Sequence, residues 1–268
     1  MITELKYSKT NTYLIQGERG SLMFDTGWAG TFPMLCKALG EKGIRLGDID
    51  YLLISHYHPD HMGIAQEIAD AGVKILAAEQ QRDHLHDADG VFEKEKNRDF
   101  IPIRDSEVEF TDPSRSRGVL RKLGIDGEIV HTPGHTEDSI SLWLESERAR
   151  FVGDLNPLYE LEMHRGTAIA QSWGRLLRLS PRVVYYGHAR TAVLDGRDVK
   201  ALQESNDSDT YALVKRIVKL IDKGCYAEEI QQKTGADPVF IGDVTRMYLT
   251  HPNVSVQGIL DRIEIKGR

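Results

Sequence analysis

The sequence has no long apolar run and only two cysteines among its 268 residues. Its apolar stretches, such as YLLI at 51–54, are far shorter than the roughly 20 apolar residues that a membrane-spanning helix needs. Cys36 and Cys225 are distant in sequence and indicate no disulfide framework, which favours a reducing compartment. The N-terminal segment lacks a basic region followed by an apolar stretch, so we expect no signal peptide. These absences predict a cytoplasmic protein without a membrane partner.

Positive charge is also in short supply. The 34 Lys and Arg residues are outnumbered by 41 Asp and Glu residues, which gives a net charge of −7 and an isoelectric point near 5.8. This balance disfavours a general affinity for nucleic acid or for anionic membranes. Hydrophobic residues make up 40% of the chain and the mean hydropathy is −0.38, values typical of a globular protein with a sizeable core. The length suits one large domain, or one domain with a small appendage.

Strand-like and helix-like segments alternate along the chain, which predicts an α/β fold in which helices cover a sheet. The segments with strand character are 11–17, 20–27, 49–56, 73–79, 127–134, 139–146, 149–154 and 182–187. The segments with helix character in the same part of the chain are 31–43 and 63–72. From about residue 197 the pattern becomes helical, and 209–224 places Leu213, Ile217 and Leu220 on one face.

Residues 81–118 follow neither pattern. They are highly charged, which predicts an inserted helix or a mobile loop that acts as a lid over the site, and no core element. Within this region, Arg115, Arg117 and Arg121 could meet an anionic substrate, although a solvated helix face is the simpler interpretation.

Four residues with metal-binding side chains lie within the segment SHYHPDHMG at 55–63. In an extended chain, residues two apart point the same way, so His56 and His58 are expected to aim at one point. A proline then turns the chain, and Asp60 and His61 follow in the loop before the next helix. Imidazole nitrogens and carboxylate oxygens together suit zinc or a similar divalent ion. The segment therefore predicts a metal site.

Three more candidate ligands lie just after other strand-like segments: His135 in HTPGHTEDS, Asp154 in FVGDLNP and His188 in VVYYGHA. The ends of strands on a rigid scaffold commonly present side chains to a shared cleft. Together with the histidine-rich motif and the DTG at 25–27, these residues resemble the signature of the metallo-β-lactamase superfamily. The resemblance covers about residues 10–195, and it specifies a fold more closely than a substrate.

The resemblance implies an αββα sandwich, two β-sheets flanked by helices, that holds two divalent metal ions. Seven residues would be their ligands: His56, His58 and His135 for the first ion, Asp60, His61 and His188 for the second, and Asp154 for both. Asp25 would orient the histidine-rich loop without touching a metal, although on sequence alone it could equally be a turn residue. Zn²⁺ is the expected metal, with Fe or Mn as alternatives.

Two adjacent divalent ions can share a hydroxide and polarise a carbonyl or phosphoryl group. The resemblance therefore implies hydrolysis by that hydroxide, and Asp60 would also position it or move a proton to the leaving group. Members that hydrolyse β-lactams usually have Cys or Ser where this chain has Asp154, an aspartate typical of the glyoxalase II, lactonase and phosphodiesterase branches. The leading expectation is a hydrolase of a small ester, thioester or lactone. A β-lactamase and a single-iron sulfur dioxygenase are less favoured.

The spacing of His135, Asp154 and His188 resembles the lactamase-beta-2-like group, whose members end in a small winged-helix-like module and include an endoribonuclease. We therefore expect a catalytic domain over 1–200 and a helical, winged-helix-like extension over 201–268. Residues 206–268 hold nine Lys or Arg and nine Asp or Glu, and this neutrality disfavours nucleic-acid binding. The expected partners are a small-molecule substrate and a second copy in a homodimer, with nucleic acid as the alternative.

Candidate substrate-binding residues lie beyond the bridging aspartate. The segment LYELEMHRG emerges from the strand-like run that ends at Asp154, and it supplies Tyr159, His164 and Arg165. We expect these three side chains to line the cleft, and the substrate to be recognised by residues 81–121 and 155–175.

Overall fold

The structure, a computed structural model, describes the whole chain except residues 165, 196–208, 237, 251–255, 257–258 and 260–268. The chain divides into two compact units. The first comprises Met1–Pro157 and Leu179–Val199, and the second comprises Leu158–Arg178 and Lys200–Arg268. The segment ILDRIEI at 259–265, which would be the closing element of the expected winged-helix-like extension, lies, apart from Ile259, outside the described residues.

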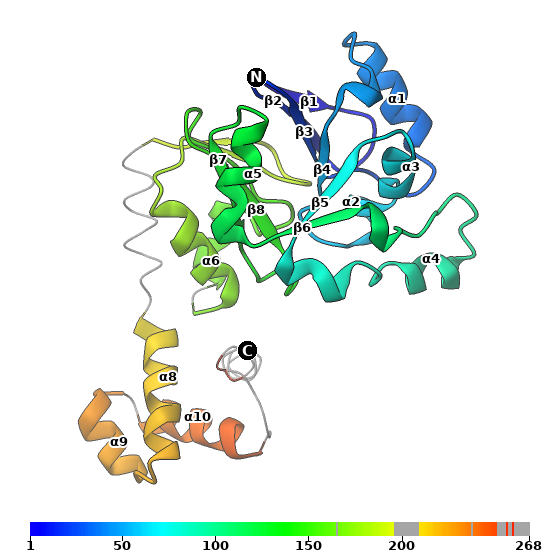
Figure 1. Ribbon diagram of the computed structural model, residues 1–268. Coiled ribbons are helices and arrows are strands. Elements are labelled where there is room, and N and C mark those ends of the chain that lie inside the picture. The colour runs from blue at the N-terminus through cyan, green and yellow to red at the C-terminus, as the bar shows by residue number, and fades with distance from the viewer. Residues whose placement is uncertain (165, 196–208, 237, 251–255, 257–258, 260–268) are drawn as a thin grey trace. The chain divides into compact units, whose positions relative to one another are not determined.

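Two β-sheets form the centre of the first unit (Figure 1). The six-stranded sheet contains, in spatial order, β1 (Ile2–Leu5), β2 (Thr12–Gln16), β3 (Ser21–Phe24), β4 (Tyr51–Leu53), β5 (Lys74–Ala78) and β6 (Val108–Thr111). Its first three strands are antiparallel, and β3 to β6 are parallel. The four strands β2 to β5 correspond to strand-like segments of the sequence, whereas β1 and β6 were not predicted.

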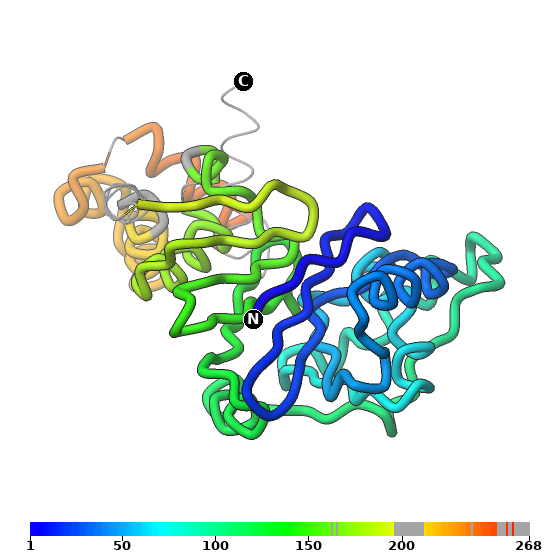
Figure 2. Tube along the Cα trace, turned by 90° about the horizontal axis from the view of Figure 1, so that it is seen from above, coloured from blue at the N-terminus to red at the C-terminus, as the bar shows by residue number. Residues whose placement is uncertain are grey.

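The five-stranded sheet has the spatial order β11-β10-β9-β8-β7. Its strands are β7 (Gly127–His131), β8 (Ile140–Leu144), β9 (Ala149–Phe151), β10 (Val183–Tyr185) and β11 (Ala192–Val193). The pair β9 and β10 is parallel, and the other pairs are antiparallel. Seen from above, the β1–β3 strands run beside the strands of this second sheet (Figure 2).

Side chains of the first sheet alternate between two cores because successive residues of a strand point to opposite faces. On β3, Met23 packs with the helices on one face, while its neighbours Leu22 and Phe24 pack against the second sheet. On β4, Leu52 and Leu53 divide in the same way. The continuous apolar runs in these strands therefore reflect burial on both faces.

Helices cover the outer face of the first sheet, where Figure 1 shows α1 and α3. The helices of this unit are α1 (Phe32–Gly40), α2 (Pro59–Met62), α3 (Ala65–Asp70), α4 (Asp89–Glu95) and α5 (Ser116–Lys122), and α5 packs on β7. Short 3₁₀ turns occupy Leu46–Asp48, Glu79–His84, Asp105–Glu107 and Pro113–Arg115. Two sheets flanked by helices are the architecture that the sequence predicted.

Residues 81–118 contain more structure than their charge predicts. Strand β6 extends the first sheet, and Leu85 and Phe92 are buried in the helix-side core. The expectation that this segment contributes no core element is therefore wrong, because a few spaced apolar residues suffice to anchor it beneath charged outer faces. Its action as a lid remains a prediction.

The second unit is helical among its described residues. It contains the 3₁₀ helix η5 (Leu158–His164) and α6 (Ala168–Leu177), then α8 (Asp209–Asp222), α9 (Ala227–Thr234) and α10 (Pro238–Thr250). The last three helices enclose a core of their own, which includes Val214, Ile217, Ile230, Ile241 and Val244. No helix in the described ranges is long and apolar enough to cross a bilayer.

Candidate metal centre

All seven predicted ligands belong to the first unit, and most lie where its strands end. Asp60 and His61 lie in the short helix α2 and not, as expected, in a loop before the next helix. His56 and His58 follow β4, Asp154 follows β9, and His188 follows β10. His135 lies in the connection from β7 to β8. The ends of both sheets thus bring together residues that are far apart in the sequence.

The candidate ligand atoms form three overlapping groups, and within each group they lie no more than 4.8 Å apart. The groups are His56, His58 and His135; His56, His61 and Asp154; and Asp60, His61 and His188. Opposed imidazole nitrogens are close: His135 Nε2 lies 3.1 Å from His58 Nδ1, and His61 Nε2 lies 3.3 Å from His188 Nε2. The first and third groups coincide with the sets predicted for two ions.

Asp154 lies between these two sets. Its Oδ1 is 3.2 Å from His61 Nε2, and its Oδ2 is 3.5 Å from His188 Nε2 and 3.7 Å from His135 Nε2. A Cβ at position 187 would lie 2.5 Å from Asp154 Oδ1, so Gly187 provides the space that this carboxylate occupies. One carboxylate therefore reaches histidines of both predicted sites.

The donor set fits divalent cations. His56 Nε2 is buried and has no hydrogen-bond partner in the part of the chain that the structure describes. Leaving a buried polar atom unpaired costs about 1–3 kcal/mol, which a bound cation would offset. Imidazole nitrogens and carboxylate oxygens at this spacing suit zinc, and they also suit iron. The residues present therefore fit divalent metal ions, and zinc and iron both suit them.

The charges of the histidines differ across the centre. Burial lowers the pKa of His61, but the carboxylates of Asp25 and Asp154 outweigh this effect and raise it to about 10. Burial and the surrounding histidines hold the pKa of His56 well below its usual range. Burial raises the pKa of Asp60, but hydrogen bonding to His188 and the nearby His61 lower it overall to about 2. Without a metal, His61 is charged at pH 7 and His56 is neutral.

Asp25 contacts residues of the histidine-rich segment, and its side chain is 1% exposed. Its Oδ1 accepts a hydrogen bond from Ser55 N (2.6 Å), and its Oδ2 accepts from Ser55 Oγ (2.9 Å) and from His61 Nδ1 (3.0 Å). Ser55 Oγ also lies 3.0 Å from His56 Nδ1. The carboxylate thus contacts His61 directly and His56 through Ser55, and the Nε2 atoms of both rings remain available. Sequence reasoning missed Ser55, although its place directly before His56 was a signal.

The β1–β2 connection holds the opposite side of the centre. The backbone oxygen of Lys9 lies 3.2 Å from His188 Nδ1, and Thr10 Oγ1 donates a 2.7 Å hydrogen bond to the backbone oxygen of Asp60. Sequence reasoning missed these contacts because nothing in the local pattern relates residues 9–10 to histidines so distant in the chain.

The sequence of residues 6–188 matches the metallo-beta-lactamase superfamily, a stretch that covers more than half of the chain and every candidate ligand. The chain belongs to this superfamily. Its membership agrees with the two-sheet architecture and with the clustered histidines and aspartates.

Several curated relatives are similar to this superfamily member over part of its length. A beta-lactamase-like protein 2 homolog of Caenorhabditis elegans is 28% identical over 156 residues, 54% of this chain and 43% of the relative. A hydroxyacylglutathione hydrolase of Methylobacterium nodulans is 28% identical over 170 residues, 60% of this chain and 52% of the relative. An atrochrysone carboxyl ACP thioesterase of Aspergillus fumigatus is 29% identical over 150 residues, which are 54% of this chain and 29% of the relative. The chain thus spans about half, or less, of the length of these relatives.

Solved structures share the fold. The metallo-beta-lactamase family protein TTHA1429 from Thermus thermophilus aligns with a TM-score of 0.58 and 21% identity, covering 91% of this chain and 90% of that one. TTHA1623 in a di-iron-bound form aligns with a TM-score of 0.55 and 20% identity, covering 72% of this chain and 94% of that one. At these identities the likeness establishes the fold alone.

Metal loading of this superfamily member is expected to release protons and to strengthen as the pH rises. The raised pKa keeps His61 protonated at pH 7, and ligation requires its neutral ring. Between pH 6 and 8 the zinc affinity should therefore rise about tenfold per pH unit for each proton released. Titration calorimetry of the metal-stripped protein in two buffers of different ionisation enthalpy measures the number of protons released per metal ion bound. Zinc binding without proton release at pH 7 would contradict the protonation of His61.

The three candidate substrate-binding residues belong to the second unit. Tyr159 is 81% exposed, His164 is half-buried, and Arg165 lies outside the described residues. Their contact with a substrate remains a prediction.

A cleft with a volume of about 630 Å³ borders the centre at Asp60 and His188. Its other lining residues are Tyr7, Ser8, Lys9, Thr10, Trp28, Thr31 and Met34. Sequence reasoning expected the substrate pocket within 81–121 and 155–175, and so missed this cleft, whose walls come from two connections near the N-terminus.

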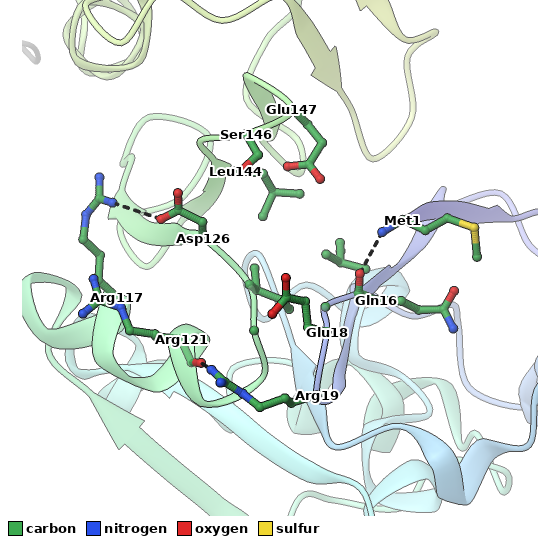
Figure 3. Close-up of a pocket in the computed structure, with 14 residues that line it drawn as sticks. Met1, Gln16, Glu18, Arg19, Arg117, Arg121, Asp126, Leu144, Ser146 and Glu147 are labelled. Carbon is green, nitrogen blue, oxygen red and sulfur yellow. Dashed lines mark hydrogen bonds and ion pairs between the residues drawn. The ribbon is translucent and has the colours of Figure 1, made fainter.

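A second hollow, of about 690 Å³, lies where β2 ends and β7 begins, at the opposite ends of the strands from the metal centre (Figure 3). None of the seven candidate ligands lines it. Its Arg117 is held by Glu128 (Nε, 3.0 Å) and by Glu145 (Nη1, 2.8 Å). Arg117 is thus neutralised by acidic neighbours, which favours the interpretation of this basic cluster as a structural surface.

Proposed function

We propose that the protein is a metal-dependent hydrolase that cleaves a small ester, thioester or lactone with two divalent ions. The observation that carries this proposal is the position of Asp154, whose two oxygens reach histidines of both ligand sets. His56, His58 and His135 would hold one ion, and Asp60, His61 and His188 the other, with Asp154 shared. The bound ions would lower the pKa of a water molecule and polarise the scissile carbonyl group.

The side chains of the protein orient and move protons around that chemistry. Asp60 is about one-third exposed, and its Oδ2 lies 2.9 Å from His188 Nε2. Its low pKa keeps it a carboxylate at neutral pH, so it would accept a hydrogen bond from the attacking water and orient it. A proton that it takes from this water could then pass to the leaving group. The contacts of Asp25 and Ser55 fix the rings of His61 and His56 for ligation.

A thioester is the favoured substrate class. One relative is a hydroxyacylglutathione hydrolase and another is a carboxyl ACP thioesterase. An aspartate at position 154, in place of a cysteine or serine, further favours these branches over β-lactam hydrolysis. We propose zinc as the metal. Iron is the alternative, since a structure of the same fold holds two irons.

The deciding experiment combines metal analysis of the purified protein with a substrate panel of thioesters, lactones, β-lactams and single-stranded RNA. We expect two equivalents of zinc per chain and turnover of thioesters that is lost on chelation and restored by the metal. One equivalent of iron with dioxygen consumption would replace the proposal with an oxygenase. RNA cleavage without thioester turnover would replace it with an endoribonuclease, and size-exclusion chromatography of the same preparation tests the expected homodimer.

A further inference from the structure

The side chains of Tyr7, Trp28 and Met34 form the apolar part of the cleft beside Asp60 and His188. Trp28 follows β3 and packs edge-on against Phe92, with ring centroids 5.2 Å apart. This contact holds the Trp28 ring in place. Met34 lies in the first turn of α1 with 55% of its surface exposed, which leaves its side chain free to meet a ligand. The volume of about 630 Å³ lies in the range of pockets that hold small ligands.

Three hydroxyl groups of this lining, those of Ser8, Tyr7 and Thr31, are engaged within the protein. Thr31 Oγ1 donates a 2.7 Å hydrogen bond to the backbone oxygen of Trp28, and Ser8 Oγ donates a 3.1 Å bond to that of Thr10. The Tyr7 hydroxyl accepts a 3.2 Å bond from the hydroxyl of Thr12. The surface that remains for a ligand is therefore largely carbon, except at the exposed Lys9 and at the end where the candidate metal ligands lie.

We propose that this cleft binds the acyl chain of the substrate, with Tyr7, Trp28 and Met34 as the residues that select an apolar chain of medium length. The proposal rests on the proposed hydrolase function, since it places the scissile carbonyl at the Asp60 and His188 end. The acyl side is favoured over the leaving group because the thiols of biological thioesters carry amide and charged groups, which a carbon-lined cleft would leave without partners.

Two isomeric thioesters distinguish the acyl side from the thiol side. S-methyl thiohexanoate carries its chain on the acyl carbon, and S-pentyl thioacetate carries the same carbons on sulfur. Each buried methylene adds to transition-state binding, so we expect kcat/KM for S-methyl thiohexanoate to exceed that for its isomer by about tenfold or more. Equal values, or a preference for S-pentyl thioacetate, would overturn the proposal while leaving the hydrolase function intact.

The variant Met34→Asp tests whether Met34 contacts the acyl chain. An aspartate suits the first turn of a helix, so α1 should still form, while a carboxylate beside the chain opposes its burial. We expect the ratio of kcat/KM between hexanoyl and acetyl thioesters to fall about tenfold. Cys36→Ala, which changes an exposed residue of the same helix that does not line the cleft, should keep the wild-type ratio. An unchanged ratio in a folded Met34→Asp variant would contradict the assignment.

Binding supplies a readout that does not depend on turnover. Hexanoate and acetate present the same carboxylate, so calorimetry on the purified protein isolates the contribution of the chain. We expect hexanoate to bind about tenfold more tightly than acetate, and Met34→Asp to remove this difference. If no thioester is hydrolysed, the proposed function fails, but this difference would still support the cleft as an acyl site. Equal binding of both acids would overturn it.

Discussion

If the proposed centre holds two ions, Asp154→Ala is expected to remove one of them and to lower the proposed thioester turnover by about 10³-fold or more. The two oxygens of Asp154 lie 3.2–3.7 Å from three histidine nitrogens that belong to both ligand sets. Alanine leaves each set without its shared ligand, so the two ions are no longer held close together. Metal analysis after dialysis and kcat/KM for a thioester measure the two effects.

The control for this variant is Asp126→Asn, which changes an exposed carboxylate away from the centre. It should retain the wild-type metal content and activity. Restoration of activity by excess metal would show that Asp154 acts through affinity. Two equivalents of metal that survive dialysis in Asp154→Ala would show instead that this residue does not bridge the sites.

Asp25→Ala is expected to weaken both the fold and the metal centre. Its carboxylate is buried and accepts three hydrogen bonds, from the backbone and hydroxyl of Ser55 and from the ring of His61. Removal of one partner from a buried, charged network costs about 3–5 kcal/mol. Asp25 also has φ of 61°, a left-handed conformation in which alanine costs about 1 kcal/mol more. Thermal unfolding should show a lower Tm, by about 10 °C.

Asp25→Asn separates the two effects. Asparagine tolerates the left-handed conformation and fills the same space, but its NH2 group cannot accept the hydrogen bonds that one carboxylate oxygen receives. The loss of stability should therefore be about 1–3 kcal/mol, smaller than for alanine. Its amide lacks the charge that orients and polarises His61, and the metal affinity should still fall about 10–100-fold. Competition with a chelator measures that affinity. If Asp25→Asn binds zinc as tightly as the wild type, Asp25 serves the fold alone.

The sequence predicted the parts of the fold that local patterns encode. The strand-like runs at 11–17, 20–27 and 73–79 correspond to β2, β3 and β5, and the spacing of Leu213 and Ile217 predicted α8. Strand β6 was missed because an edge strand needs few apolar residues, and its charged neighbours mask the alternation.

The candidate metal residues were also legible in the sequence, since four of them lie in one short motif and the others follow strand-like runs. The supporting residues were not. In the sequence Ser55 is an ordinary polar residue, and only the structure shows that its hydroxyl lies between Asp25 and His56. Thr10 contacts the backbone of Asp60 across 50 positions of sequence, a distance that no local pattern reports.

The candidate metal-binding side chains and most of the strands and helices were thus determined by the sequence itself, because both depend on residue type and short-range spacing. The tertiary structure decided which oxygens and nitrogens face one another, that Asp154 reaches both ligand sets, and that Trp28 and Met34 border the centre. These are consequences of how two sheets pack and where their connections pass. The physical reason is that a cleft arises from the packing of segments distant in sequence, whereas each ligand is a property of one residue.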